Sequence, residues 1–339
     1  MNILITGGCG FIGSNFINYY YNITQGVINT QGDNSLESND INIVCLDAMY
    51  YCASYDNINK DIYASSRYTH IDGNLCDFNL VKKILIDHKI THIVHFAAQS
   101  HVDSSFNESF KYTQDNVVGT HNLLEAIKQV NSEYKTDIFI LHFSTDEVYG
   151  ESLDNMMKNE QSILCPTNPY SASKAAAEMY VYSYMHSFNI KAIITRGNNV
   201  YGINQYPEKL IPKFIKLLME NKKCTIAGNG SMIRNFIHVY DVCTAVDIII
   251  NKGIIGQIYN IGSDPSNEYS VMDVTKKLLL LINNITLTDS NMNNYIEYIE
   301  DRPFNDTRYF ISNDKLINLG WQQTIMFDDG LKDLVTSYK

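Results

Sequence analysis

The sequence predicts an α/β protein in which a doubly wound parallel sheet is joined by a smaller α/β domain. In the first two hundred residues, short apolar runs alternate with stretches of helical spacing, which is typical of repeated strand–helix–strand units. A glycine-rich turn follows the first apolar run directly and precedes an amphipathic stretch. The 339 residues, 45% of them hydrophobic, suffice for one large domain or two medium ones.

The first strand–helix–strand unit is expected at the N-terminus. Residues 2–6 predict an apolar strand, residues 11–21 have helical spacing, and residues 41–47 predict a second strand that ends in an acid. The stretch 24–40 is polar and rich in Asn and Ser. We expect it to be a surface insertion that interrupts this unit and carries no chemistry.

Two further strands are expected at residues 90–98 and 137–144, which are rich in β-branched and aromatic side chains. Residues 117–130 between them have the spacing of a helix. Strands that alternate with helices indicate a parallel sheet covered by helices on both faces.

The pattern changes after about residue 196. Pro207 and Pro212 bracket the start of a helix, and residues 240–251 and 271–282 have helical spacing with irregular segments between them. This part of the chain predicts a smaller domain that closes over the strand ends.

Two domains are therefore expected, with boundaries set by this change of pattern. Residues 1–195, with a return segment at about 237–262, are expected to form the first domain. Residues 196–236 and 263–339 are expected to form the second, substrate-binding domain. Open α/β sheets bind their ligands outside the carboxyl ends of the strands, where such a domain would lie.

Charge and hydropathy exclude several classes of partner. Lys and Arg number 26 against 37 Asp and Glu, which gives a net charge of −11. This balance repels nucleic acid and anionic membrane surfaces, so neither is an expected partner. No apolar run is long enough to cross a membrane, and the first residues lack the basic flank of a signal peptide. We expect a cytoplasmic protein.

The seven cysteines are scattered singly, without a Cys-x-x-Cys pair. Neither a disulfide framework nor a zinc knuckle is indicated, and free reduced thiols are expected. No two histidines have the spacing of a helical metal site with an intervening Glu. The sequence therefore predicts no metal.

The glycine-rich turn predicts a dinucleotide site of the Rossmann type. It satisfies Gly-x-x-Gly-x-x-Gly from Gly7 through Gly10 to Gly13, and it also fits the related pattern that begins at Gly8. Glycines let the backbone approach a pyrophosphate, and the following helix offers free N–H groups and the positive end of its dipole. Asp47 at the end of the second strand is expected to accept the ribose hydroxyls, which favours NAD over NADP.

Tyr170 and Lys174 are four residues apart on one face of a helix that starts near Pro169. With 24 tyrosines in the chain, roughly one or two such pairs arise by chance, so the spacing alone carries no inference. This pair, however, follows a strand that would deliver its end to a nicotinamide. An ammonium beside a phenol lowers the pKa of the phenol, which predicts that Tyr170 serves as a general base.

Two adjacent acids, Asp146 and Glu147, follow the strand at 137–144 after one residue, Thr145. Their side chains point different ways in an extended segment, so one can act as an acid and the other as a base on one substrate. A helix cap or a solvated turn is the alternative for such a pair. Its place beside the Tyr-Lys helix favours the catalytic interpretation.

These residues resemble the nucleoside-diphosphate-glucose 4,6-dehydratases of the extended short-chain dehydrogenase/reductase family. The matching stretches cover nearly the whole chain. They are TGGCGFIG at 6–13, HFAAQSHVD at 95–103, STDEVYG at 144–150, PYSASKAAAE at 169–178, RGNNVYG at 196–202, YPEKLIPKFI at 206–215 and RPFNDTRY at 302–309. The acid pair is the specific feature, since related epimerases carry small residues there and UDP-glucuronate decarboxylases have Ser-Glu.

The resemblance implies a mechanism that agrees with the roles inferred from the residues. Tyr170, assisted by Lys174, removes the proton of the glucose 4-hydroxyl while hydride leaves C4 for NAD. Glu147 abstracts the C5 proton, Asp146 protonates the departing 6-hydroxyl, and the hydride returns to C6. Thr145 binds the sugar 4-oxygen. This requires Asp146 to be protonated and Glu147 ionised at the start, hence two carboxyl groups of different pKa.

The resemblance also implies the binding residues and the assembly. The Gln99, RGNN and RPFND segments look most like the dehydratase half of plant UDP-rhamnose synthases, which favours UDP-glucose over dTDP-glucose and a step toward rhamnose. A homodimer built from the helices at 117–130 and 170–188 is implied. Asn74 stands where many relatives have Asp against the adenine. The implied cofactor contacts are Gly7, Gly10, Phe11, Ile12, Gly13, Asp47, Asn74, Leu75, Ala97, Tyr170 and Lys174, and the implied substrate contacts are Ser100, Thr145, Asn199, Lys209, Arg234 and Arg302.

Two other functions stay open at this point. A UDP-sugar 4-epimerase or UDP-glucuronate decarboxylase of the same fold would share the glycine-rich turn and the Tyr-Lys pair but would not need Asp146. A non-catalytic NAD sensor is an alternative of a different class, and it would have no use for the four catalytic side chains.

Overall fold

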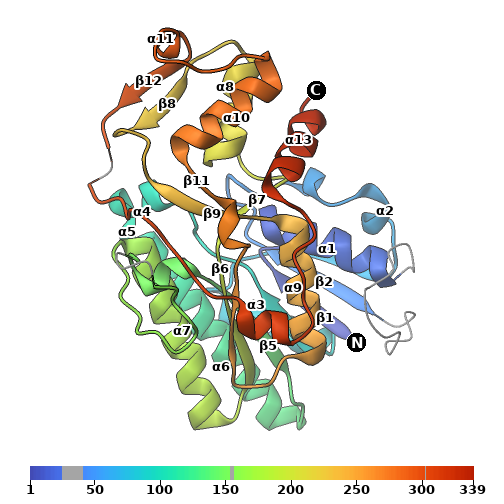
Figure 1. Cartoon of the computed structure of the whole chain (residues 1–339). Coiled ribbons are helices and arrows are strands. Elements are labelled where there is room, and N and C mark those ends of the chain that lie inside the picture. The colour runs from blue at the N-terminus through green and yellow to red at the C-terminus, as the bar shows by residue number, and fades with distance from the viewer. Residues whose placement is uncertain (25–40, 153–155, 302) are drawn as a thin grey trace.

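A seven-stranded parallel sheet forms the centre of the protein (Figure 1). The computed structural model describes residues 1–24, 41–152, 156–301 and 303–339. The strand order is β10-β6-β5-β4-β1-β2-β3, and every neighbouring pair is parallel. The strands are β1 (Asn2–Thr6), β2 (Asn42–Asp47), β3 (Tyr68–Asp72), β4 (His92–His95), β5 (Phe139–Thr145), β6 (Lys191–Gly197) and β10 (Ile258–Ile261).

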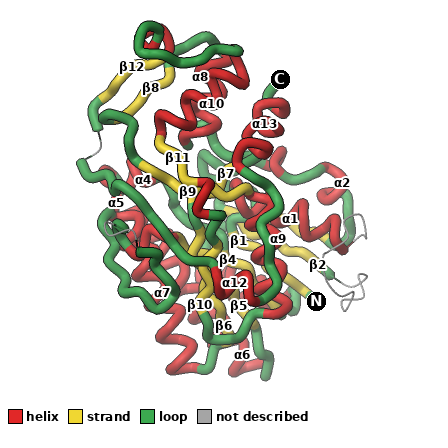
Figure 2. Tube along the Cα trace, in the orientation of Figure 1, coloured by secondary structure: helices red, strands yellow, loops and turns green. Residues whose placement is uncertain are grey.

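Helices cover both faces of this sheet, because each strand carries apolar side chains on both sides. In β1, Ile3 and Ile5 pack in one core with α1 (Phe11–Thr24) and α9 (Val239–Lys252). Leu4 points the other way into a second core. That core is completed by α3 (Phe78–Asp87), α6 (Gly119–Tyr134) and α7 (Pro169–Phe188). The two layers of helices enclose the strands in Figure 2.

A second group of elements lies beyond the carboxyl edge of the large sheet (Figure 1). It has a three-stranded sheet in the order β11-β9-β7, a two-stranded sheet of β12 and β8, and a core of its own around Phe214, Leu278 and Phe327. Its elements are β7 (Asn199–Tyr201), α8 (Leu210–Met219), β8 (Cys224–Ala227), β9 (Ile233–His238), β11 (Glu268–Ser270), α10 (Val271–Asn283), β12 (Ile296–Ile299) and α13 (Phe327–Ser337).

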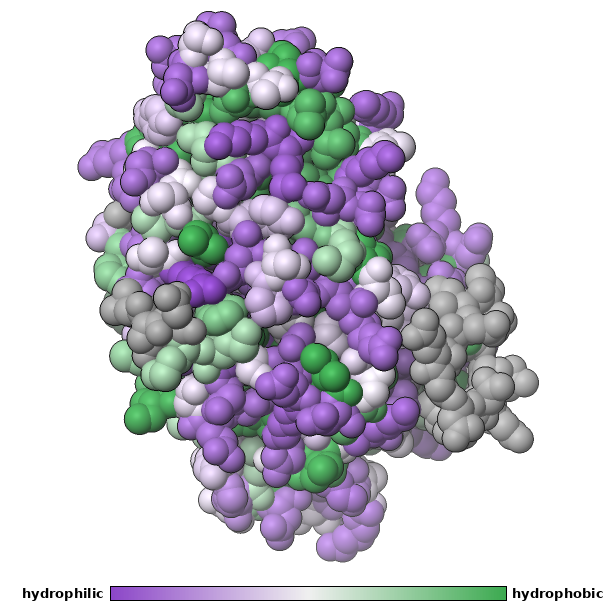
Figure 3. All heavy atoms as spheres, in the orientation of Figure 1, coloured by the Kyte–Doolittle hydropathy of each residue, from purple (hydrophilic) through white to green (hydrophobic). Residues whose placement is uncertain are grey.

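Short helical turns make most of the remaining connections. They are the 3-10 turns Tyr55–Asn57, Asp146–Tyr149 and Pro265–Asn267, a π-helical segment Thr113–Val118, and α2 (Lys60–Tyr63), α4 (Val102–Asn107), α5 (Ser109–Tyr112), α11 (Met292–Tyr295) and α12 (Asp314–Asn318). No helix of the described ranges is both long and apolar enough to cross a membrane. On the face in Figure 3, hydrophobic residues lie in small groups among hydrophilic ones.

The predicted α/β class and the doubly wound parallel sheet are confirmed, whereas several bounds differ. Of the seven strands, β3, β6 and β10 had not been predicted. The strand expected at 90–98 ends at His95, because the chain then leaves the sheet and lines a pocket. The strand expected at 137–144 runs from Phe139 to Thr145. Of the insertion expected at 24–40, only Thr24 lies within the described residues, as the last residue of α1.

The topology places β10 in the large sheet, whereas β8, β9 and β12 lie outside it. This arrangement is compatible with a chain that leaves the first domain and returns to it. The domain boundaries at 195, 236 and 262 stay a prediction.

Helix α7 is fixed to β6 by a buried ion pair. Glu178 of α7 is fully buried and accepts hydrogen bonds from Arg196 of β6, with Nη2 at 2.6 Å and Nε at 3.1 Å. Arg196 Nη1 also donates to the Tyr149 hydroxyl at 2.8 Å. At its N-terminus, α7 is capped by Asn168, whose side chain accepts from Ser171 N in a capping box. The helix is thus held in place at two points along its length.

Replacement of Glu178 by Ala should lower the free energy of unfolding by about 3–5 kcal/mol, because the Arg196 guanidinium stays buried without its counter-charge. Urea unfolding followed by circular dichroism measures the change. The matched control is Glu133→Ala, which removes a half-exposed ion pair with Lys82 and should cost no more than about 1 kcal/mol. Equal losses in the two variants would contradict a structural role of the buried pair.

Candidate active site

The glycine-rich turn between β1 and α1 approaches other backbone segments too closely for a side chain. Gly7 has a φ of +69°, and a Cβ there would lie 2.7 Å from Ala97 Cα. A Cβ on Gly13 would lie 2.2 Å from the carbonyl oxygen of Gly7. The N–H of Gly7 donates to Leu46 O at 2.8 Å, which joins the turn to β2. The turn therefore leaves the N-terminus of α1 open toward the pocket, where its N–H groups can bind an anion.

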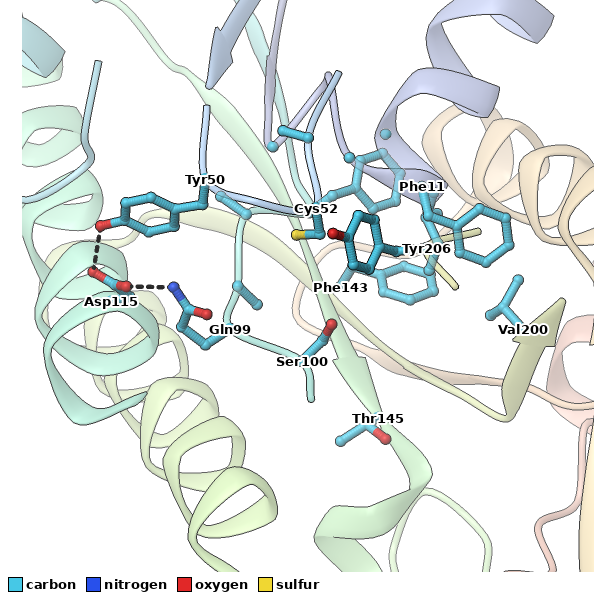
Figure 4. Close-up of a pocket in the computed structure, with 18 of the residues that line it drawn as sticks. Phe11, Tyr50, Cys52, Gln99, Ser100, Asp115, Phe143, Thr145, Val200 and Tyr206 are labelled. Carbon is cyan, nitrogen blue, oxygen red and sulfur yellow. Dashed lines mark hydrogen bonds between the residues drawn. The ribbon is translucent and has the colours of Figure 1, made fainter. Parts of the chain in front are cut away.

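One pocket runs along the carboxyl ends of β1, β2, β4, β5 and β6 (Figure 4). Most residues that the sequence predicts for the site line it together. They are Gly7, Gly10, Phe11, Ile12, Gly13, Asp47, Asn74, Leu75, Ala97, Ser100, Thr145, Asp146, Glu147, Tyr170, Lys174, Asn199 and Lys209. Segments that are distant in sequence thus meet in one cavity, as a parallel sheet requires.

Asp47 and Asn74 stand at the ends of β2 and β3, where the adenosine side of a dinucleotide is expected. The Asp47 carboxylate accepts from Cys9 N at 2.9 Å and from Met49 N at 2.8 Å. Asn74 accepts from Cys76 N at 2.7 Å, and its Nδ2 donates to the Tyr50 hydroxyl at 2.8 Å. The backbone and side-chain partners fix both groups in position, while both side chains still line the pocket.

A hydrogen-bonded series that the sequence did not predict lines the same side of the pocket. Gln99 Nε2 donates to Asp115 at 2.7 Å, and the Tyr50 hydroxyl donates to the other oxygen of Asp115 at 3.4 Å (Figure 4). Asn74 continues the series at Tyr50. Tyr50 and Gln99 each follow the end of a parallel strand, and Gln99 also stands in the matching HFAAQSHVD stretch, but neither had been assigned to the site. Asp115 lies in a π-helical segment that no motif marks.

The two adjacent acids are held in different surroundings at the end of β5. Asp146 is 2% exposed, and Asn198 donates to its Oδ2 at 2.7 Å. Burial, and next the charge of Glu147, raise the pKa of Asp146 to about 7. Asn198 had not been predicted as a site residue, although it directly follows β6 at the same edge of the sheet.

Glu147 is half-buried and accepts hydrogen bonds from two other side chains. Asn168 Nδ2 donates to its Oε2 at 3.2 Å, and the Tyr309 hydroxyl donates to the same oxygen at 3.4 Å. Burial raises the pKa of Glu147, while the Asn168 hydrogen bond and the charges of Arg234 and Lys209 oppose the rise. One buried acid that is protonated near neutrality thus stands beside another that has donors and cations to stabilise its ionised form.

Thr145 links the two acids to the strand. Its hydroxyl oxygen accepts from Glu147 N at 3.3 Å as the cap of a 3-10 turn, and its O–H donates to Asp146 Oδ1 at 3.2 Å. The turn directs the two carboxyl groups to different partners although they are neighbours in sequence.

The expectation that Lys174 lowers the pKa of Tyr170 is wrong for the protein in this state. Burial, followed by the charge of Glu147, raises the pKa of the Tyr170 hydroxyl above its ordinary value, and Asp146 adds to the rise. Lys174 instead donates to the carbonyl oxygen of Phe143 at 2.7 Å. Burial lowers the pKa of Lys174 itself to about 8. The ammonium thus binds a backbone carbonyl, while burial and the charges of two nearby acids keep the pKa of Tyr170 high.

The predicted substrate contacts separate into three groups. Ser100, Asn199 and Lys209 line the pocket, and Lys209 Nζ donates to Ser100 O at 2.7 Å. Arg234 on β9 does not line it. Its guanidinium donates to Asp306 O at 2.9 Å and lies over the Tyr309 ring at 4.9 Å, near enough to act on the pKa of both acids. Arg302 lies outside the described residues.

Comparisons with known proteins give relatives over the full length of the chain. A dTDP-D-glucose 4,6-dehydratase of Dictyostelium discoideum is 42% identical, over 99% of this chain and 81% of the relative. A trifunctional UDP-glucose 4,6-dehydratase/UDP-4-keto-6-deoxy-D-glucose 3,5-epimerase/UDP-4-keto-L-rhamnose-reductase of Arabidopsis thaliana is also 42% identical. That match covers 99% of this chain but 47% of the plant protein, so the chain spans about half of that relative.

A solved structure has the same fold. The dTDP-glucose 4,6-dehydratase of Bacillus anthracis, in complex with NAD, superimposes with a TM-score of 0.84 and 34% identity, over 100% of this chain and 96% of that one. The family model described as GDP-mannose 4,6 dehydratase matches residues 4–334. The resemblance inferred from the sequence motifs is confirmed, and this chain belongs to the GDP-mannose 4,6 dehydratase family.

Proposed function

We propose that this protein is an NAD-dependent hydro-lyase that converts a nucleoside-diphosphate glucose to the 4-keto-6-deoxy sugar. The observation that carries the proposal is the adjacent pair of a buried Asp146 and a half-buried Glu147, which lines the same pocket as Tyr170 and the glycine-rich turn. Elimination of water needs an acid for the departing hydroxyl and a base for the neighbouring carbon, and the pair offers both. The names of the relatives, which are dTDP- and UDP-glucose 4,6-dehydratases, agree with this reaction.

The described residues fit a dinucleotide at one end of the pocket. The close backbone approach at Gly7 and Gly13 leaves room for a pyrophosphate at the start of α1, and Asp47 faces the place of a ribose. Bound NAD would supply reversible two-electron oxidation of the sugar. We infer that the holding residues are those that the sequence predicts, namely Gly7, Gly10, Phe11, Ile12, Gly13, Asp47, Asn74, Leu75, Ala97, Tyr170 and Lys174.

Three side chains would each move one proton. Tyr170 Oη would take the proton of the sugar 4-hydroxyl, since Tyr170 is buried and lines the same pocket as the glycine-rich turn and the acids. Glu147 would take the C5 proton, because the Asn168 hydrogen bond and nearby cations favour its carboxylate. Asp146, which is protonated near neutrality, would donate to the departing 6-hydroxyl.

The remaining part of the pocket would bind the nucleotide sugar. Lys209 brings a cation beside Ser100, and Asn199 brings an amide, both suited to a diphosphate and hydroxyl groups. Thr145 stays the proposed partner of the sugar 4-oxygen. We further propose Arg234 and Arg302 as diphosphate contacts, although Arg234 would have to leave the carbonyl oxygens that it now binds.

We propose a homodimer built from α6 and α7 and a cytoplasmic location. Exposed apolar side chains support the dimer, because Met179, Tyr180 and Tyr182 of α7 are 52%, 37% and 48% exposed. The location is supported by the cysteines, which are all described and all lack a disulfide, as is typical of a reducing compartment.

We also retain the proposed domains, 1–195 with a return segment at about 237–262, and 196–236 with 263–339.

The purified protein, incubated separately with UDP-glucose and dTDP-glucose, should release a product lighter by one water from at least one of them. Mass spectrometry measures this, and no NADH should accumulate because the cofactor is regenerated. We expect UDP-glucose to be the better substrate, as the resemblance of the Gln99, RGNN and RPFND segments implies. A galactose isomer of unchanged mass would instead indicate an epimerase and overturn the proposal.

Replacement of Asp146 by Asn should lower the rate of water loss by about 10²–10⁴-fold, because the amide cannot donate the proton that the leaving hydroxyl needs. Oxidation at C4 does not need this acid, so NADH absorbance should rise in the variant on addition of substrate. Tyr170→Phe is the matched control, since it should abolish that absorbance change as well. Loss of both signals in Asp146→Asn would contradict a role limited to elimination.

The dependence of kcat/KM on pH should show a basic limb near pH 7. Burial raises the pKa of Asp146 from its usual acidic value to about 7, so the group is protonated below that pH and loses the proton above it. The acid form is the active one, and activity should therefore fall about tenfold per pH unit well above the pKa. Stopped assays from pH 5.5 to 9 measure the profile. A profile flat through pH 9 would show that Asp146 is not the acid.

A further inference from the structure

Two cysteines and a histidine from three separate segments meet outside the active-site pocket. Cys45 of β2 and His70 of β3 are direct partners in the parallel register, so their side chains lie on the same face of the sheet. Cys9 reaches them from the glycine-rich turn. Its Sγ lies 4.0 Å from Cys45 Sγ and 3.7 Å from His70 Nδ1, and all three atoms lie within 4.8 Å of one another. None of the three residues lines the pocket.

These separations suit one tetrahedral metal ion. With Zn–S near 2.3 Å and Zn–N near 2.0–2.1 Å, tetrahedral angles place two sulfurs about 3.8 Å apart and a sulfur and a nitrogen about 3.6 Å apart. The observed separations of Cys9 from its two partners exceed these values by no more than a few tenths of an ångström. Thiolate and imidazole ligands select a borderline-soft cation such as Zn²⁺ over Ca²⁺ or Mg²⁺.

The histidine ring is oriented as a metal ligand requires. His70 Nε2 lies 2.8 Å from Asp72 Oδ1, and the Tyr55 hydroxyl donates to the same carboxylate at 2.9 Å. A proton on Nε2 leaves the Nδ1 lone pair directed at Cys9 Sγ and, at 3.5 Å, at the Tyr68 hydroxyl. A carboxylate behind the distal nitrogen is the usual support of a zinc-bound histidine.

The two cysteines are shielded from solvent, whereas the histidine can be reached by it. Cys9 and Cys45 are fully buried, whereas the His70 side chain is 14% exposed and marks the way in from solvent. Tyr63 adjoins the cluster, since the centroid of its ring lies 6.2 Å from that of the His70 ring. Its oxygen is buried and has no hydrogen-bond partner among the described residues. This oxygen, or a water beside it, can fill the fourth position.

We propose that Cys9, Cys45 and His70 form a Zn²⁺ site that fastens the glycine-rich turn to β2 and β3. Binding replaces the two thiol protons, which pass to solvent, and leaves the imidazole neutral, so the step involves no change of oxidation state. The metal ion would lie outside the cofactor pocket. It would still be linked to that pocket, because the N–H of Cys9 donates to Asp47 at 2.9 Å. Metal at Cys9 would thus hold the turn and the ribose-binding acid in one arrangement.

Cobalt titration of the reduced, chelator-treated full-length chain tests the site. We expect one Co²⁺ per chain, with sulfur-to-cobalt charge-transfer bands and the d–d bands of a tetrahedral ion, and we expect Zn²⁺ to remove them. Cys45→Ala and His70→Ala should weaken binding at least about 100-fold, and Asp72→Asn about 10–100-fold. The matched control is Cys243→Ala, which removes a buried thiol elsewhere and should bind Co²⁺ as the parent does.

A second readout is independent of colour. Zn²⁺ in excess should raise the melting temperature of the parent and of Cys243→Ala but not of His70→Ala, because only a folded site binds the metal. If Cys45→Ala does not fold, Asp72→Asn decides, since Asp72 is largely exposed and its loss spares the core. Absent thiolate bands in the parent, equal affinity in Asp72→Asn, or a Cys9–Cys45 disulfide that persists under reductant would overturn the proposal.

Discussion

The pocket depends on one constraint, which is that neighbouring parallel strands all end at the same edge of the sheet. The ends of β1, β2, β4, β5 and β6 deliver the glycine-rich turn, Asp47, the loop at 96–101, the acid pair and Asn198 to a single cavity. Apart from the two adjacent acids, these groups are far apart in the sequence, and the sheet brings them together. A shift of β5 by one residue relative to β4 and β6 would move Asp146 to the other face of the sheet.

Burial at that edge disfavours the charged forms of the ionisable side chains, and the surrounding residues stabilise those charges to different degrees. Burial raises the pKa of Asp146, Glu147 and Tyr170, while it lowers that of Lys174. Two amides from neighbouring elements favour the ionised forms of the acids, since Asn198 donates to Asp146 and Asn168 donates to Glu147. Asn168 also caps α7, so the residue that starts the helix of Tyr170 stabilises the proposed base. Rigid elements thus set the proton state of each group.

Sequence patterns predicted what is local in the chain and missed what the fold assembles. The glycine spacing, the acid pair and the Tyr-Lys pair are short motifs, and all of them line the pocket. Asp115 lies in no motif, and Asn198 stands in the RGNNVYG stretch without having been assigned to the site, because the two residues act through partners 16 and 52 residues away. The same limit applies to Cys9, Cys45 and His70. The fold brings them together, in part through the register of β2 and β3, and their spacing in the sequence matches no metal-binding motif. The pKa of Tyr170 was mispredicted because sequence spacing shows neither its burial and the charge of Glu147 nor the hydrogen bond from Lys174 to Phe143 O.

The acids and the tyrosine form one coupled proton system. The charges of Glu147 and Asp146 both raise the pKa of Tyr170, so loss of either charge makes the phenolate easier to form. Protonation of Asp146, which occurs near neutrality, removes one of those charges. The proton that prepares Asp146 to act as an acid therefore also helps Tyr170 to act as a base. Because Glu147 keeps cations and donors of its own, the pocket can hold one carboxylate and one carboxylic acid at the same time. Two neighbouring carboxyls are thereby given the opposite roles that elimination of water demands.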